Sequence, residues 1–97
     1  MNLPVIFRPE AEEDVQEIYQ WYESQQPGLG EEFIRILREK LDIVRDHPEL
    51  FALIYKNVRR IILSKFPYLV FYISTGDQII VLAILHAFRD PANWPQR

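Results

Sequence analysis

Three apolar segments in the second half of the chain constrain its fold more than any other feature. They cover residues 58–63, 68–74 and 78–88, and short polar connections separate them. Each segment is rich in Val, Ile, Leu, Phe and Tyr, which favour strands, and neither connection is long enough to hold a helix. Thr75-Gly76-Asp77 predicts a tight hairpin turn, because glycine takes the positive φ that such turns require. The three segments therefore predict a three-stranded antiparallel unit.

The first half of the chain predicts two helices, at about residues 10–26 and 30–47. Apolar side chains recur at helical spacing in both, in stripes that begin at Val15 and Phe33. Pro27-Gly28 ends the first helix, because proline cannot continue it. The connection is short, so we expect an antiparallel helix hairpin.

The order of these elements predicts an α+β fold. Residues 3–7 form a further short strand, and residues 48–57 form a loop, or a loop with a fragment of strand at 53–55. The two apolar helix stripes must be buried, and the sheet offers the only apolar surface large enough. We therefore expect both helices on one face of an antiparallel sheet that the N-terminal strand joins. At 97 residues the chain forms one domain, 1–97.

The net charge of −3 conceals a difference between the two halves of the chain. Residues 1–50 hold five Lys/Arg and twelve Asp/Glu, a net charge of −7, whereas residues 51–97 hold six Lys/Arg and two Asp, a net charge of +4. A protein that holds RNA or DNA mainly through phosphate contacts is expected to be basic overall. Direct nucleic-acid binding is therefore not expected.

The residue types present also limit cofactors and location. The chain has no cysteine, and His47 and His86 lie far apart, so the sequence predicts neither a disulfide nor a metal site, and no cofactor. Its start lacks the pattern of a signal peptide, and no apolar stretch is long enough to span a membrane. We expect a cytoplasmic protein with no membrane partner.

Three motifs follow one another along the chain. They are Pro9-x-Ala11-x-x-Asp14-Val15-x-x-Ile18 with Trp21-Tyr22, Arg59-Arg60 followed by Phe66-Pro67-Tyr68-x-Val70-x-Tyr72, and Val81-Leu82-Ala83-Ile84-x-His86-x-x-Arg89-Asp90-Pro91. In this order and spacing they resemble the RelE/ParE superfamily, the toxins of bacterial type II toxin–antitoxin (plasmid stabilisation) modules. The resemblance covers nearly the whole chain. It implies the α+β toxin fold and a cognate antitoxin as partner.

The superfamily contains two activities, and the resemblance favours one of them. The RelE-like branch comprises ribosome-dependent endoribonucleases, with basic residues on the second and third sheet strands and an arginine and an aromatic or acid–base residue near the C-terminus. In this chain Arg60 and Arg89 match two basic positions and Trp94 lies near the aromatic one, but Ile62 and Leu69 occupy the other two. Apolar side chains neither stabilise phosphate charge nor transfer protons. The chain therefore looks closer to the ParE-like branch, whose members inhibit DNA gyrase by binding.

Two other functions remain open at this point. One is a RelE-like mRNA endoribonuclease, in which Arg60, His86 and Arg89 would be catalytic. The other is a decayed toxin that retains only antitoxin binding.

Six residues are the candidates for target binding: Arg59, Arg60, Lys65, His86, Arg89 and Trp94. Each has an ordinary structural alternative. One of the two adjacent arginines can pair with a helix carboxylate, His86 can be a hydrogen-bonded residue at a strand end, and Lys65 can be a solvated charge at a turn.

The antitoxin is expected to bind at exposed edges of the toxin. A sheet of about four strands leaves open edges, to which a partner segment can add a strand or a helix. The remaining expected partner is a protein target, DNA gyrase.

Overall fold

The computed structural model describes residues 3–88, and the candidates Arg89 and Trp94 lie outside this range. The elements follow the order strand, two helices, four strands. They are β1 (Val5–Phe7), α1 (Pro9–Gln25), α2 (Leu29–Asp46), β2 (Leu53–Tyr55), β3 (Val58–Ile62), β4 (Tyr68–Ser74) and β5 (Ile79–His86). The predicted α+β class is confirmed, and both helices lie within a few residues of their predicted bounds.

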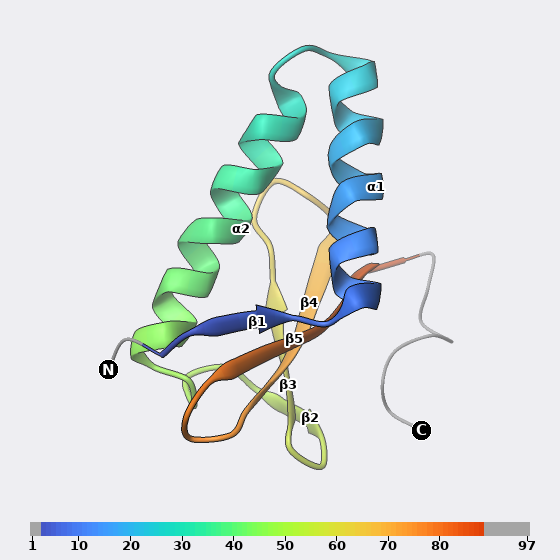
Figure 1. Ribbon diagram of the computed structural model, residues 1–97. Coiled ribbons are helices and arrows are strands. Elements are labelled where there is room, and N and C mark those ends of the chain that lie inside the picture. The colour runs from blue at the N-terminus through green and yellow to red at the C-terminus, as the bar shows by residue number, and fades with distance from the viewer. Residues whose placement is uncertain (1–2, 89–97) are drawn as a thin grey trace.

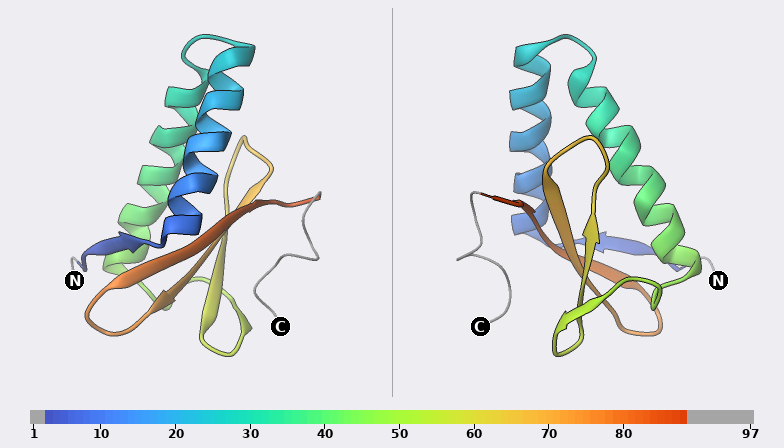
Figure 2. Two further views of the ribbon diagram at one scale, coloured as in Figure 1. Left: turned by 45° about the vertical axis from the view of Figure 1, so that its right-hand side comes forward. Right: turned by 180° about the vertical axis from the view of Figure 1, so that it is seen from behind.

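The two helices form the predicted antiparallel hairpin and cover one face of the sheet (Figures 1 and 2). β1 crosses in front of the hairpin, from the C-terminal end of α2 to the start of α1 (Figure 1). We call the opposite side of the sheet the open face, because neither α1 nor α2 covers it. Neither helix is long and apolar enough to cross a membrane.

The sheet has five strands in the order β1-β5-β4-β3-β2. The predicted antiparallel unit is present as β3, β4 and β5, and β2 extends it, so the 53–55 fragment is a true strand. β1 joins the sheet as predicted, but it runs parallel to β5, so the sheet is mixed rather than wholly antiparallel. A parallel pair needs a long crossover between its strands, and here the helix hairpin and the rest of the sheet supply it.

β5 carries a bulge that changes which face its residues occupy. Val81 pairs with Tyr72 and Ala83 pairs with Phe71, which leaves Leu82 without a partner on β4. An unpaired residue of this kind reverses the alternation of faces beyond it. Ile79 and Val81 face the helices before the bulge, and Ile84 faces them after it.

Apolar side chains are buried on both faces of the sheet. The main core lies between the helices and the sheet and includes Phe33, Ile61, Val70 and Tyr72. A second, smaller cluster lies on the open face and is formed by Val58, Leu69 and Phe71 with partly buried neighbours. The sheet is therefore apolar on both sides, which explains why β4 is an almost continuous apolar run.

The helix hairpin is closed by contacts at its turn. Gly28 has a φ of 92°, and its N–H donates to a carboxylate oxygen of Glu23 at 2.9 Å. The other Glu23 oxygen accepts the N–H of Gly30, also at 2.9 Å. One carboxylate thus satisfies two main-chain donors at the start of α2, where the helix dipole also favours a negative charge.

Gly30 is expected to be intolerant of a side chain. An ideal Cβ at this position would lie 2.7 Å from the Tyr19 carbonyl oxygen and 2.8 Å from Tyr19 Cδ1. Ala has the better helix propensity, but relieving this overlap would move α1 away from α2. We expect Gly30→Ala to lower the free energy of unfolding by about 1–3 kcal/mol, as overpacked sites do. Gly28→Asn is the matched control, because a Cβ there meets no atom within 4 Å and Asn tolerates a left-handed conformation. Equal urea midpoints for Gly30→Ala and the wild type would contradict the prediction.

Tyr72 should make stability depend on pH in the alkaline range. Its hydroxyl donates to the Pro48 carbonyl at 2.9 Å, and burial raises its pKa to about 12, against a smaller opposing effect of Arg59. Because the folded pKa exceeds the unfolded value of 10.0, this stabilisation is complete below pH 10 and is lost as pH rises towards 12. Tyr72→Phe should be less stable by about 1 kcal/mol at neutral pH.

Urea unfolding at neutral pH and at about pH 11 would test this linkage. We expect the advantage of the wild type over Tyr72→Phe to shrink at the higher pH, and Tyr55→Phe serves as a control on the edge strand. A difference between wild type and Tyr72→Phe that does not change with pH would show that the linkage is wrong.

Candidate functional site

The open face is apolar at two of the positions that match the basic centre of the RelE-like enzymes. Across the sheet, Ile62 pairs with Leu69, and Leu69 pairs with Leu85. Ile62 is 62% exposed, whereas Leu69 is buried. These two residues are therefore direct neighbours in the position of the expected cations, and neither can hold a charge.

Arg60 lies beside this apolar row. It pairs with Phe71, whose side chain is fully buried on the open face. The Nε atom of Arg60 is buried and has no hydrogen-bond partner among the described residues. An unpartnered buried donor is unfavourable, so Arg60 lowers the stability of the fold at this position.

His86 faces the opposite side of the sheet from Arg60. It pairs with Tyr68, a member of the main core, so its ring lies on the helix side. The rings of His86 and Tyr68 are 5.2 Å apart and nearly perpendicular. Arg60 lies on the open face, so the sheet separates two residues that the ribonuclease alternative needs at one phosphate.

A pocket of about 350 Å³ lies between α1 and the end of β5 beside His86. Its α1 side carries Asp14, Glu17 and Trp21, and Trp21 is 54% exposed. The N–H of Phe88 donates to Nδ1 of His86 at 3.1 Å, which matches the structural alternative for this residue. The pocket combines carboxylates with aromatic rings and contains no Lys or Arg among the residues described.

Asp14 has a structural task that the sequence did not reveal. Its Oδ2 accepts the main-chain N–H of Ile84 at 3.0 Å. The contact joins α1 to β5 immediately after the bulge. The motif in α1 marked Asp14 as notable, but only the fold identifies its partner.

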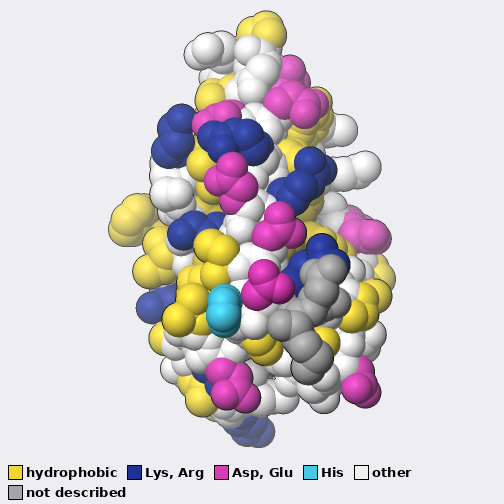
Figure 3. Space-filling model, turned by 90° about the vertical axis from the view of Figure 1, so that its left-hand side faces the viewer, with side chains coloured by type: hydrophobic (Ala, Val, Ile, Leu, Met, Phe, Trp, Pro, Cys, Tyr) yellow, Lys and Arg dark blue, Asp and Glu magenta, His cyan; other side chains and the backbone are white. Residues whose placement is uncertain are grey.

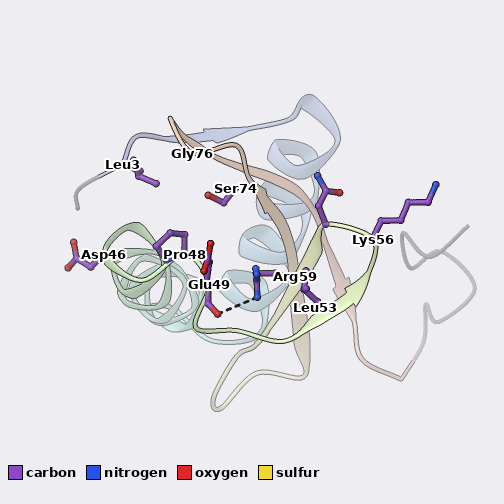
Figure 4. A pocket seen from close by; sticks show the side chains of 10 residues that line it. Leu3, Asp46, Pro48, Glu49, Leu53, Lys56, Arg59, Ser74 and Gly76 are labelled. Atoms are coloured by element: carbon purple, nitrogen blue, oxygen red, sulfur yellow. Dashed lines mark hydrogen bonds between the residues drawn. The ribbon is translucent and has the colours of Figure 1, made fainter.

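Arg59 points away from Arg60 and holds a loop in place. Its Nη1 donates to the carbonyls of Phe51 at 2.7 Å and of Glu49 at 3.3 Å. Figure 4 shows Arg59 inside a pocket of about 680 Å³, with Glu49 and Leu53 beside it. The predicted alternation of the two arginines is confirmed, but Arg59 binds main-chain carbonyls rather than a helix carboxylate. Its part in target binding stays a prediction.

Lys65 lies in the turn between β3 and β4 and forms an ion pair with a residue of α2. Its Nζ lies 2.9 Å from Glu32 Oε2, and Glu32 also pairs with Arg35 at 2.6 Å. Hydrogen bonds from Arg35 and then from Lys65 lower the pKa of Glu32 to about 2. Lys65 remains exposed and forms a solvated ion pair with Glu32. It does not form one cluster with Arg60 and His86.

The outer surface of α2 carries both signs of charge (Figure 3). Arg35 pairs with Glu32 and Glu39, and Arg45 lies 3.7 Å from Asp42. Residues 29–46 hold four Lys/Arg and five Asp/Glu, so α2 contributes only −1 to the net charge of −7 of the first half of the chain. Among residues 3–88 no group of His, Cys, Asp or Glu side chains is arranged to hold a metal ion.

These features define a small α+β protein in which a helix hairpin covers one face of a mixed five-stranded sheet. A family model described as the ParE toxin of the type II toxin–antitoxin system parDE matches residues 5–91. The chain belongs to this toxin family, and the predicted superfamily and branch are confirmed.

The fold also occurs in solved structures. A chain from the "Chromosomal ParDE TA system from P. aeruginosa" superposes with a TM-score of 0.74 at 18% sequence identity, covering 88% of this chain and 96% of that chain. No curated protein matches the sequence.

The two adjacent arginines should differ in what they do for stability. Arg59→Met removes hydrogen bonds to the carbonyls of Glu49 and Phe51, so we expect the free energy of unfolding to fall by about 1–2 kcal/mol. Arg60→Met removes a buried donor without a described partner, so it should leave stability unchanged or raise it. Urea unfolding of the two variants measures both effects. Equal losses in the two would contradict the assignment.

Proposed function

We propose that this chain is the toxin of a two-protein module and inhibits its cellular target, DNA gyrase, by binding rather than by cleaving RNA. A cognate antitoxin neutralises it, and the pair acts in the bacterial cytoplasm. The family match supports the toxin role, and the similar structure from a ParDE system supports an antitoxin partner.

One observation carries the choice of binding over cleavage. Arg60 and His86 lie on opposite faces of the sheet, so they cannot act on one phosphate without a rearrangement of β5. Cleavage of RNA by its own 2′-hydroxyl needs a base, an acid and cations around a single phosphorus atom. Ile62 and Leu69 add nothing to such a centre.

The proposed target surface is the open face around Arg60. Its exposed Ile62 supplies apolar contact area, and the partly exposed side chain of Arg60 supplies a positive charge beside it. An apolar patch with one arginine near its centre is a common arrangement in protein–protein interfaces. Arg89 and Trp94 follow β5 in the sequence, and we assign them to the same interaction.

Purified toxin should inhibit gyrase supercoiling and should not cleave mRNA on ribosomes. Arg60→Gln should raise the inhibitory concentration at least about tenfold, because a desolvated charge contact is lost. His86→Ala should leave inhibition unchanged wherever the protein stays folded. Lys56→Gln is the matched control, since it removes an exposed cation at the turn between β2 and β3. Cleavage of mRNA at codon positions, abolished by His86→Ala in a folded protein, would instead assign the chain to the ribonuclease branch.

A further inference from the structure

The outer edge of β1 has unused main-chain hydrogen-bonding groups. The N–H of Ile79 donates to the Pro4 carbonyl at 2.8 Å, and the N–H of Arg8 donates to the Val81 carbonyl at 3.0 Å. The even-numbered residues of β1 thus face β5. Since main-chain groups alternate along a strand, the N–H and C=O groups of Val5 and Phe7 point outward. No described strand lies on that side, because β1 is the first strand of the sheet.

An apolar groove runs along this edge. It is formed by two adjoining pockets of about 290 and 580 Å³, which share Phe7 and Val15. Its floor consists of side chains from β1, α1 and α2, namely Val5, Phe7, Val15, Ile34, Leu37 and Leu41. Val5, Phe7, Val15 and Ile34 are only partly buried, so further apolar surface there can be removed from water.

The other edge of the sheet is protected against pairing. β2 has a register irregularity between Leu53 and Tyr55, and Lys56 follows it with its Nζ 5.2 Å from the centre of the Tyr55 ring. Bulges and lysines are devices by which proteins block strand addition at an edge. β1 has neither, and its pairing with β5 is regular. Ile6, on the open-face side of β1, is 47% exposed.

The two walls of the groove carry opposite charges. Arg38 and Arg45 lie on the α2 wall, where Asp42 offsets Arg45 at 3.7 Å and no described carboxylate pairs with Arg38. Glu12 and Glu13 line the α1 wall near Phe7. A complementary segment would therefore place a carboxylate next to Arg38 and a cation next to the two glutamates.

We propose that the edge of β1 is the docking site for an extended segment of the antitoxin, which adds to the sheet beside β1. Its alternate apolar side chains fill the groove, and an acidic side chain of the segment faces Arg38. Main-chain hydrogen bonds to Val5 and Phe7 give affinity, and the groove and Arg38 give selectivity. This inference rests on the proposed function, since it assumes that the chain has an antitoxin.

Amide hydrogen exchange followed by NMR tests strand addition directly. The probe is the full-length product of the short open reading frame next to the toxin gene, co-expressed and purified as the complex. The amides of Val5 and Phe7 should exchange rapidly in the free toxin and slow at least about tenfold in the complex, because each gains an acceptor. A complex that forms without slowing these two amides overturns this inference and leaves the proposed function standing.

Two further outcomes also decide between explanations. If no complex forms and the neighbouring protein does not rescue growth, both the inference and the antitoxin assignment fail. If the two amides are already slow in the free toxin and slow further with protein concentration, the occupant of the edge is a second copy of this chain, and the inference is overturned.

Matched substitutions at the two edges give a second, independent measurement. Ile6→Lys at β1 should weaken antitoxin binding at least about tenfold, while Leu53→Lys, a 55% exposed residue at β2, should not change it. Arg38→Glu should also weaken binding, and raising the salt concentration should reduce the difference from wild type. Thermal melts of the free variants separate these effects from misfolding. Equal losses for Ile6→Lys and Leu53→Lys would overturn the assignment to β1.

Discussion

The bulge in β5 is the constraint on which the placement of the candidate residues depends. Leu82 has no partner on β4, and beyond it Ile84 and His86 face the helices. If the same sequence continued in strict alternation from Val81, with no bulge, His86 would turn to the open face, on the side of Arg60. The contact from Asp14 of α1 to the N–H of Ile84 stabilises β5 at this point. One hydrogen bond between distant segments thus supports the separation of the two residues that a nuclease would need together.

The helix hairpin is fixed to the sheet by a group of aromatic rings. Phe33 of α2 contacts Phe66 at 5.5 Å and Tyr68 at 6.0 Å, and Tyr22 of α1 contacts Phe66 at 4.9 Å between ring centres. All three pairs are edge-to-face, which is a favourable arrangement for aromatic rings. Because one cluster joins both helices to the sheet, α1 is held close enough for Asp14 to reach β5.

The sequence was sufficient for the elements and for the antiparallel unit of β3, β4 and β5, but not for the bulge in β5 or for the partner of β1. Periodic apolar residues predict both helices, and the three apolar runs predict β3, β4 and β5, because local pattern decides element type. The run of β5 contains no polar residue between Ile79 and Leu85, so no alternation was visible and the bulge could not be predicted. The parallel pairing of β1 with β5 could not be predicted either, because a strand of three residues is too short to indicate its partner.

The contacts of the charged candidate residues could not be predicted from the sequence either. Arg59 binds carbonyls of a loop, and Lys65 pairs with Glu32, a residue on a different element. Such partners depend on tertiary position and follow no spacing rule. The composition, with no cysteine and an overall negative charge, predicts only which kinds of function not to expect.

The two proposed surfaces lie on different parts of one sheet, and this affects how neutralisation works. β3, which carries Arg60 and Ile62, lies three strand spacings from β1, or about 14 Å. A strand added at β1 therefore extends the open face without covering it. A pairing of three residues is also weak by itself, so the antitoxin must gain further contacts elsewhere. The added strand lies one spacing further from β3, at about 19 Å, a distance that about six extended residues span. A single segment that docks at β1 and continues across the open face would thus block Arg60 as well.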